Sequence, residues 1–200
     1  MLRARDNPFT TDRVLRVRYR FDSDDWARLY ERLVHQRGRG ALVGPKGSGK
    51  TTLLEDLAIR LRHEGKDVTL IRLSAEAPAL PGMYNKTFFS CLTRSDAVLL
   101  DGAEQLSATR WLRFRWCTRR AGIVVVTIHR AGRLQTLHRC TTSPALLCDL
   151  VSSLGQKLDT AKAEALHQRH RGNLREAMRE LYDQCAEKNA RTLSSPISHV

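Results

Sequence analysis

The sequence lacks the features that mark membrane-spanning and disulfide-stabilised proteins. No apolar run approaches the roughly 20 residues that a membrane helix needs, so we expect no membrane span. The N-terminus carries no apolar stretch of the kind that signal peptides have. The five cysteines are widely spaced and include no CxxC pair, which favours reduced thiols over a disulfide framework or a zinc site. Together these absences indicate a cytoplasmic protein.

Acidic side chains are scarce as well. The chain has 21 Asp and Glu against 34 Lys and Arg, which gives a formal net charge of +13. Arg supplies most of the positive charge, and its planar guanidinium forms paired hydrogen bonds to phosphate and carboxylate groups. This balance favours polyanionic partners such as a nucleotide, a nucleic acid or an anionic surface. A genome that favours Arg codons would give the same composition, so charge alone leaves the partner open.

Internal repeats and low-complexity blocks are also absent, and the 200 residues suit one compact domain with a small appendage. Short apolar runs alternate with helical patterns as far as residue 142. The expected strands cover residues 41–43, 68–73, 97–100, 123–127 and 136–140. Because strands alternate with helices, the sequence predicts an α/β fold with a three-layer αβα core around a parallel sheet.

The pattern changes after residue 142, where only helices are expected. Ser143 can cap a helix, and Pro144 suits its first position. The expected helices cover residues 143–154, 159–170 and 173–187. The sequence therefore predicts a P-loop-containing core followed by a helical subdomain and a flexible tail. These parts span residues 1–142 (with an N-terminal segment and helix over residues 1–39), residues 143–187 and residues 188–200.

The most informative motif is a P-loop over residues 44–51, which matches the pattern GxxxxGK(S/T) in full. It lies between an expected strand and an expected helix, the context in which this motif binds phosphate. Its backbone N–H groups and the helix N-terminus would hold the phosphates, and Lys50 would reach the β and γ phosphates of a nucleoside triphosphate. The expected nucleotide-binding residues are Gly44, Pro45, Lys46, Gly47, Ser48, Gly49, Lys50, Thr51 and Thr52.

A magnesium site is expected beside the P-loop. Thr51 would place its hydroxyl on Mg²⁺. Asp101 ends an apolar strand, and in a parallel P-loop sheet such an Asp lies near the P-loop threonine and holds the metal, usually through water. The alternative is that Asp101 only caps the following helix. With the P-loop upstream, the sequence favours Thr51 and Asp101 as the metal-binding pair.

Two polar residues are candidates for the hydrolytic step. Many ATPases of this type have a Glu directly after the strand Asp, but this position is Gly102 here. Glu104 is the nearest acid, and it would act through water or would only complement the dipole of the helix expected over residues 103–120. Thr127, at the end of a strand, would touch the γ-phosphate or the attacking water, and His129 is the next candidate. An ordinary surface histidine is an equally good interpretation of His129.

One arginine of the helical part has an unusual position. Gly172 breaks one expected helix, Asn173 caps the next, and Arg175 follows in the first turn. A cation is unfavourable there unless an anion is nearby. In one interpretation Glu176 or Glu180 supplies this anion. In the other interpretation Arg175 reaches the γ-phosphate of a bound nucleotide.

These motifs together resemble the AAA+ and STAND superfamily of P-loop ATPases, over most of the chain. In this resemblance residues 44–51 match Walker A, and residues 99–101 match the end of Walker B. Thr127 lies in the sensor 1 region, and Arg175 matches the sensor 2 arginine. Residues 99–106 look most like the Walker B of NACHT-type signalling ATPases, where a Gly follows the Asp and further acids come slightly later.

The resemblance implies an αβα core followed by a helical lid, with ATP and Mg²⁺ as ligands. It implies hydrolysis of ATP to ADP and phosphate as the reaction. Such enzymes also take an arginine finger from a neighbouring subunit. We assign no residue to this role, although Arg130 and Arg133 lie in the region where it is expected. Because Gly102 stands where these enzymes have a Glu, ATP binding is more secure than hydrolysis.

The leading hypothesis is a small ATPase that couples ATP binding, and slow hydrolysis, to closure of the helical lid through a hinge near residues 140–144. Closure would control homo-oligomer assembly or the binding of a nucleic-acid or protein partner. An alternative is a non-catalytic module that uses nucleotide as a switch for such binding, which Gly102 and the net charge favour. A small-molecule kinase would need an Arg-rich lid inserted late in the core, and the sequence has no such insertion.

Arginine and aromatic residues interleave along the expected helix after Walker B. In one interpretation they form a nucleic-acid surface, because Arg contacts backbone phosphates and Trp stacks on bases. In the other interpretation, which is favoured because this helix must cover a sheet face, the aromatic rings pack on the sheet and the Arg stems extend outward. The residues are Arg110, Trp111, Arg113, Phe114, Arg115, Trp116, Arg119 and Arg120.

Overall fold

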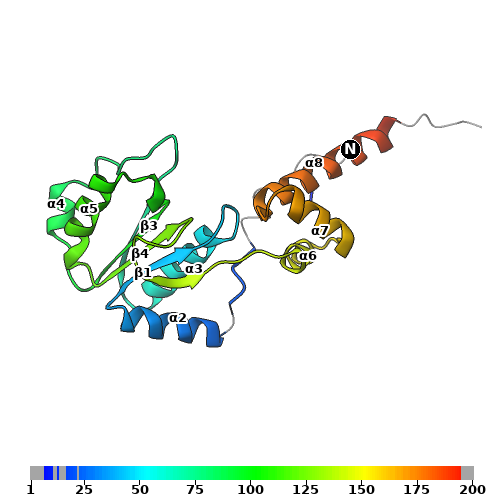
Figure 1. Ribbon diagram of the computed structural model, residues 1–200. Coiled ribbons are helices and arrows are strands. Elements are labelled where there is room, and N and C mark those ends of the chain that lie inside the picture. Colours follow the sequence, from blue (N-terminus) through cyan, green and yellow to red (C-terminus); the bar gives the residue numbers. More distant parts are fainter. Residues whose placement is uncertain (1–6, 11–12, 14–16, 22, 195–200) are drawn as a thin grey trace, which may run out of the picture. The chain divides into compact units, whose positions relative to one another are not determined.

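The computed structural model describes residues 7–10, 13, 17–21 and 23–194, and within them the chain folds into two compact units (Figure 1). The sheet unit comprises Tyr19–Pro45 and Gly49–Cys140. The helical unit comprises Lys46–Ser48, the described residues before Tyr19 and those from Thr141 onward. Each unit has buried hydrophobic residues of its own.

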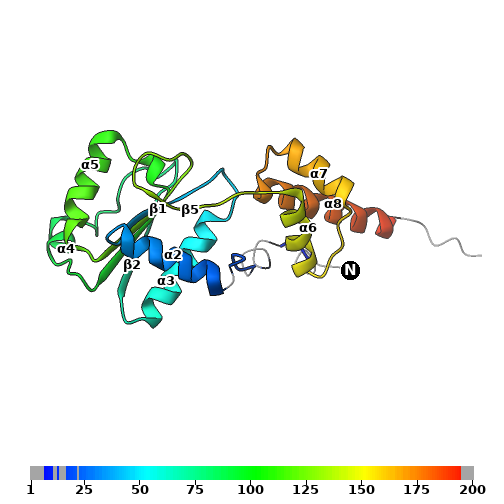
Figure 2. The same cartoon turned by 60° about the horizontal axis from the view of Figure 1, so that its bottom comes forward.

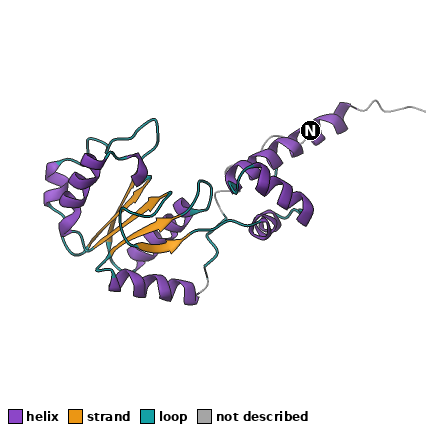
Figure 3. Ribbon diagram, viewed as in Figure 1, coloured by secondary structure: helices purple, strands orange, loops and turns teal. Residues whose placement is uncertain are grey.

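The sheet unit contains a five-stranded parallel sheet in the order β2-β3-β4-β1-β5 (Figure 3). Because every pair is parallel, the carboxyl ends of all five strands lie at the same edge of the sheet. The expected α/β fold around a parallel sheet is confirmed. The strands are β1 (Arg39–Val43), β2 (Asp67–Arg72), β3 (Asp96–Asp101), β4 (Ile123–Ile128) and β5 (Thr136–Arg139).

Helices cover both faces of this sheet, which gives the three layers expected from the sequence (Figure 2). Successive side chains of a strand point to opposite faces, so neighbouring strand residues belong to different cores. Leu99 packs with α2 and α3, whereas Val98 and Leu100 pack with α4 and α5. The helices are α2 (Ser23–His35), α3 (Lys50–His63), α4 (Lys86–Ser90) and α5 (Ala108–Cys117).

The helix expected over residues 103–120 forms three separate pieces. A single turn of 3₁₀ helix, Ala103–Gln105, follows β3, and a second one, Thr118–Arg120, follows α5. Leu106 between the first two pieces is extended, and the Ser107 hydroxyl caps α5 by accepting a hydrogen bond from the Arg110 N–H. The short first piece matters because it carries Glu104.

In its C-terminal part, as far as the structure describes it, the helical unit forms three helices around a small apolar core. As expected, the Ser143 hydroxyl caps the first helix, where it accepts a hydrogen bond from the Leu146 N–H at 3.1 Å, and Pro144 opens that helix. No helix in the described part of the chain is long and apolar enough to cross a membrane. The helices are α6 (Pro144–Ser153), α7 (Thr160–Arg169) and α8 (Leu174–Ser194), and α8 thus continues beyond its expected end near residue 187.

The helical unit also contains described residues from the beginning of the chain. The buried Asn7 side chain donates a hydrogen bond to the carbonyl of Tyr182 at 3.0 Å, and Phe9 packs against the core of α6, α7 and α8. Asn7 and Phe9 therefore belong with the C-terminal helices and not with the core expected over residues 1–142. The boundary near residue 142 stays a proposal. The flexible tail was expected over residues 188–200, but residues 188–194 continue α8, and residues 195–200 lie outside the described residues.

Gly102, directly after β3, has a backbone conformation that excludes a side chain. Its φ is +81°, a left-handed conformation that L-residues adopt only with strain. A Cβ at this position would lie 2.5 Å from the carbonyl oxygen of Leu73, which is a backbone atom that cannot move aside. The chain therefore cannot hold a Glu directly after Asp101 without shifting the strand end. This is a physical reason for the departure from the AAA+ pattern at Gly102.

We expect Gly102→Ala to lower the free energy of unfolding more than Gly65→Ala does. Gly65 has a similar φ of +77° but has no atom within 4 Å of its Cβ position, so its substitution measures the backbone strain alone, about 1–2 kcal/mol. The contact with Leu73 should add at least about 1 kcal/mol, the usual cost of overpacking. Urea denaturation of both variants measures the difference. Equal destabilisation would show that the Leu73 contact is not restrictive.

Candidate nucleotide-binding site

The P-loop connects the carboxyl end of β1 to the first turn of α3. Gly49 caps α3 with a left-handed φ of +83°, and the ring of Tyr19 lies 3.0 Å from the position of a Cβ there. The loop therefore needs glycine at residue 49 for two reasons, its backbone conformation and the close approach of Tyr19. The first N–H groups of α3 are free of intrahelical partners and suit an anion.

Lys50, the first residue of α3, is held inside the loop. Its ammonium group donates hydrogen bonds of 2.7 Å to the carbonyls of Gly44 and Pro45, and the residue is buried. Ser48 is also buried, and its hydroxyl has no hydrogen-bond partner among the described residues. A buried hydroxyl without a partner is costly, and a phosphate oxygen would satisfy it. The loop thus fits the phosphate chain that the sequence predicts.

Asp101 is fixed by two threonines, one on each carboxylate oxygen. The Thr51 hydroxyl donates to Oδ2 at 2.9 Å, and the Thr127 hydroxyl donates to Oδ1 at 2.6 Å. Thr51 lies in α3, Asp101 ends β3, and Thr127 lies in β4, the neighbour of β3 in the sheet. The structure thus brings together the two residues expected to bind metal. Hydroxyl and carboxylate oxygens are the ligands that Mg²⁺ prefers, so the pair fits this ion.

The Thr127 hydroxyl takes part in two hydrogen bonds. Besides donating to Asp101, the hydroxyl accepts a hydrogen bond from the Gly102 N–H at 2.8 Å, and the residue is only 1% exposed. It was expected to touch the γ-phosphate or the attacking water. In this structure its hydroxyl donates to the Asp101 carboxylate and so orients this candidate metal ligand, and the contact with the phosphate or water stays a prediction.

Glu104 pairs with the histidine that follows β4. Its Oε1 lies 3.2 Å from Nε2 of His129, so two residues that are separate candidates in the sequence analysis lie together. The other oxygen, Oε2, is buried and has no hydrogen-bond partner among the described residues. A carboxylate oxygen in this state suits a bound water. Because the 3₁₀ turn that carries Glu104 has only three residues, a role that merely complements a helix dipole is weakly supported.

A second side of the site was not anticipated from the sequence. The Tyr19 hydroxyl lies 3.2 Å from Nε2 of His138, and the Tyr19 N–H donates to a carboxylate oxygen of Asp56 at 3.1 Å. Burial raises the pKa of Tyr19 and of Cys140, and burial lowers the pKa of His138. All three shifts favour the neutral forms of these side chains.

Arg175 lies in the first turn of α8, in the helical unit, and its side chain is exposed. The Asn173 side chain caps α8 as expected, accepting a hydrogen bond from the Glu176 N–H at 3.4 Å. The interpretation in which Glu180 neutralises Arg175 is wrong. Within the described part of the chain, Arg175 forms no ion pair, which leaves its guanidinium available for another anion.

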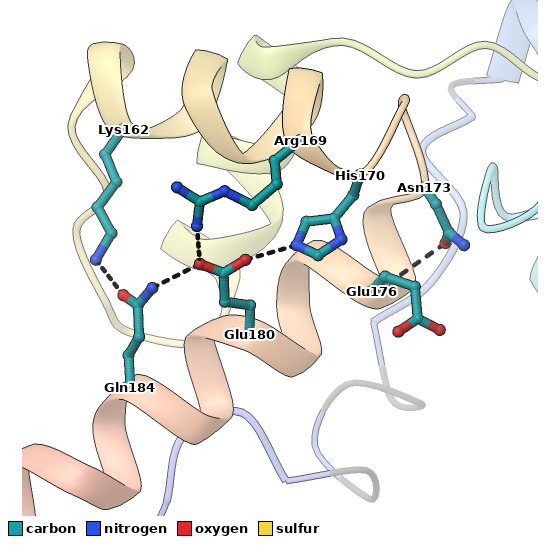
Figure 4. A network of polar contacts seen from close by, with 7 residues as sticks. All are labelled: Lys162, Arg169, His170, Asn173, Glu176, Glu180 and Gln184. Atoms are coloured by element: carbon teal, nitrogen blue, oxygen red, sulfur yellow. Dashed lines mark hydrogen bonds and ion pairs between the residues drawn. The ribbon is translucent and has the colours of Figure 1, made fainter.

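Glu180 instead joins α8 to the end of α7 (Figure 4). Its carboxylate accepts hydrogen bonds from Arg169 and from His170, the latter at 2.7 Å, and from the Gln184 side chain at 2.9 Å. The hydrogen bond from His170, together with the charge of Arg169, holds the pKa of Glu180 below its usual range. Glu180 therefore has a structural role within the helical unit.

The two arginines in the region of the expected arginine finger differ in their surroundings. Arg133 donates to the carbonyl of Leu106, and its guanidinium lies 5.1 Å from the centre of the Trp111 ring, so it is anchored within the sheet unit. Arg130 is exposed and has no partner among the described residues. Of the two, only Arg130 is available to a neighbouring subunit.

Comparisons with known proteins connect this geometry to one fold. No protein-family model matches the chain, and no curated protein matches it. Among solved structures, the chain is similar to a point variant of RuvB from Thermotoga maritima, with a TM-score of 0.50 and 19% identity over 83% of this chain and 63% of that one. A second RuvB variant from the same organism matches with a TM-score of 0.48 and 18% identity over 77% and 57% of the two chains.

The chain thus spans less than two thirds of the length of either RuvB chain. RuvB is an AAA+ P-loop ATPase, and at this level of identity the likeness concerns the fold alone. The nearer resemblance of Walker B to NACHT-type ATPases stays a prediction. The parallel sheet, the P-loop between β1 and α3, and the helices on both faces of the sheet give this chain a three-layer P-loop fold similar to that of RuvB.

Proposed function

We propose that this chain is a small cytoplasmic ATPase that binds ATP and Mg²⁺ and couples binding, and slow hydrolysis, to closure of the helical unit. Closure would control assembly into homo-oligomers or the binding of a partner. The proposal depends on one observation above all: Thr51 and Asp101, which are 50 residues apart in sequence, are joined by a hydrogen bond of 2.9 Å beside the P-loop. The free thiols of all five cysteines fit the cytoplasm.

ATP binding would use the groups that the loop already orients. The N–H groups at the start of α3 and the Ser48 hydroxyl would contact phosphate oxygens. The Lys50 ammonium would exchange its hydrogen bonds to the loop carbonyls for contacts with the β and γ phosphates. Thr51 and Asp101 would hold Mg²⁺, which supplies charge neutralisation on the phosphates when bound.

Hydrolysis would use Glu104 to orient the attacking water. Its buried Oε2 needs a hydrogen-bond donor, and a water molecule supplies one. His129, paired with Oε1, would keep the carboxylate in place. Because Gly102 excludes an acid directly after Asp101, Glu104 acts from a position two residues further along the chain than that of the usual catalytic Glu, and we expect slow turnover.

The helical unit would respond to the γ-phosphate through Arg175. This side chain is exposed and has no ion pair in the described residues, so an anionic phosphate oxygen would be a favourable partner. A hinge near residues 140–144, where the chain passes from the sheet unit to the helical unit, would permit the motion. The γ-phosphate would then stabilise the closed state.

A second function is a module that binds nucleotide as a switch without hydrolysing it. One observation favours it: the left-handed backbone of Gly102, with the Leu73 carbonyl oxygen 2.5 Å from its Cβ position, leaves no room for the usual catalytic Glu. The two functions share the P-loop and differ in the fate of the nucleotide. Release of phosphate from ATP in an excess of pure protein separates them, since the switch would return ATP unchanged.

Lys50→Ala should weaken binding of ATP with Mg²⁺ by about 10- to 100-fold, because a charge-assisted hydrogen bond contributes about 1.5–3 kcal/mol. Titration calorimetry of the wild type and the variant measures the effect. Lys86→Ala is the matched control, since this exposed lysine of α4 lies in the layer that covers the other face of the sheet. Unchanged affinity of the Lys50 variant would overturn the nucleotide-binding proposal.

Glu104→Gln should stop phosphate release while leaving ATP affinity within about twofold. The amide keeps the size of the side chain but cannot act as a base, so ATP stays bound. Phosphate release and recovery of intact nucleotide from the protein measure the two effects. Turnover at the wild-type rate would remove Glu104 from the reaction and favour the switch.

Arg175→Ala should weaken ATP binding by about tenfold and leave ADP binding unchanged, because the lost contact is to the γ-phosphate. Arg179→Ala, an exposed arginine one turn further along α8, is the control for loss of charge. Measurement of the protein's mass in solution with ATP and with ADP shows whether homo-oligomer assembly depends on the γ-phosphate. A variant that loses affinity for both nucleotides equally would contradict a sensing role for Arg175.

A further inference from the structure

The outer face of α5 exposes large apolar side chains. Trp116 is 67% exposed and Leu112 is 61% exposed, and their spacing of four residues places them one above the other on the helix. On the inner side, Trp111 and Phe114 are 7% and 1% exposed and pack on the sheet. The expected packing of aromatic rings on the sheet thus holds for two of the three rings. Trp116 contributes nothing to that core.

Arginines surround these two side chains. The two that flank them on α5, Arg113 and Arg115, are exposed, and their guanidinium groups have no hydrogen bond or ion pair among the described residues. Three others donate only to uncharged backbone carbonyls, at 3.2–3.5 Å. The sequence has no Asp or Glu between Glu104 and Asp149, so the helix carries no acid of its own. We call the following residues the α5 surface: Arg110, Leu112, Arg113, Arg115, Trp116, Arg119 and Arg120.

Trp116 and Arg119 form a flat stacked pair at the end of this surface. The guanidinium of Arg119 lies 3.9 Å from the centre of the Trp116 ring, within the range of a cation–π contact. This contact is worth about 0.5–1 kcal/mol at an exposed site, and it keeps the ring in one orientation. The ring nevertheless remains two-thirds exposed, so it offers a π-face to another molecule.

We propose that the α5 surface binds single-stranded nucleic acid. Arginines without acidic partners suit a chain of phosphates, and an exposed, oriented Trp suits stacking with a base. A duplex keeps its base faces covered, so only an unpaired strand would use both features. An acidic peptide would satisfy the arginines but has no flat ring system for Trp116.

This surface is separate from the nucleotide site. It lies on α5, which covers one face of the sheet. The helix that follows the P-loop, α3, covers the other face (Figure 2). The inference therefore does not rest on the proposed ATPase function. Lys50→Ala should leave strand binding unchanged, so failure of one proposal does not carry over to the other.

The first test is binding of a fluorescein-labelled dT₂₀ strand, followed by anisotropy in 50 mM salt without nucleotide. Trp116→Ala should weaken binding by about 5- to 100-fold, since stacking on one base contributes about 1–3 kcal/mol. Trp116→Phe, which keeps a smaller aromatic ring, should recover part of the loss. An unlabelled duplex of the same length should compete at least tenfold less well than the unlabelled single strand.

Intrinsic fluorescence tests the stacking directly. Of the three tryptophans, Trp26 and Trp111 are buried, so quenching by unlabelled dT₂₀ should come from Trp116. The quenching should disappear in Trp116→Ala, while circular dichroism reports whether that variant is folded. If the folded variant binds and is quenched as the wild type is, the proposal is overturned.

The salt dependence tests the arginines. Arg113→Gln combined with Arg115→Gln should reduce the slope of log K against log salt by about 1.4, because each phosphate contact on a single strand contributes about 0.7. The control is Arg62→Gln combined with Arg179→Gln, which removes the same charge from exposed positions on α3 and α8. If the two double variants change the slope equally, net charge alone would explain binding, and the proposal for the α5 surface would be overturned. If polyglutamate displaces labelled dT₂₀ as well as unlabelled dT₂₀ does, the surface would bind an acidic protein instead, and the proposal would be overturned.

Discussion

The Asp101 carboxylate is the point on which the site depends. A free carboxylate at the end of a strand would rotate and would be solvated, but here Thr51 holds one oxygen and Thr127 holds the other. The first bond joins α3 to β3, and the second joins β4 to β3, so three elements must be in register for both to form. The Gly102 N–H completes the arrangement by bonding to Thr127. The same contacts that stabilise the edge of the sheet therefore orient the candidate metal ligand.

The topology explains why these residues meet. In the order β2-β3-β4-β1-β5, β4 lies between β3 and β1, so the P-loop that follows β1 and the acid that ends β3 flank the end of β4. Thr127 near that end lies between the two. A hydroxyl at this place connects to Asp101 without adding a charge. The next polar residue along the chain, His129, then pairs with Glu104. The ends of β3 and β4, with the residues that follow them, therefore contact each other twice at this edge of the sheet, through Asp101 with Thr127 and through Glu104 with His129.

The sequence predicted those parts of the site that depend on local pattern. The P-loop follows from its motif, and the strand ends follow from apolar runs that stop at a polar residue, as at Asp101 and Thr127. What it missed depends on contacts between distant segments. The role of Gly102 is visible only when Leu73, which follows β2, lies beside the end of β3, and the pairing of Glu180 with the end of α7 removes it from Arg175. Tyr19, in a segment without a clear pattern, could not be connected to Gly49 from sequence alone.

The origin of the helical unit from both ends of the chain has a consequence for synthesis on the ribosome. Asn7 bonds to the carbonyl of Tyr182, a separation of 175 residues, whereas the sheet unit is contained within residues 19–140. A nascent chain can therefore complete its sheet while Phe9 still lacks the helices against which it packs. Such a long loop closure is slow, because its entropy is lost before the contact forms. During elongation β1 and α3, which flank the candidate phosphate loop, would thus form before α6, α7 and α8 exist.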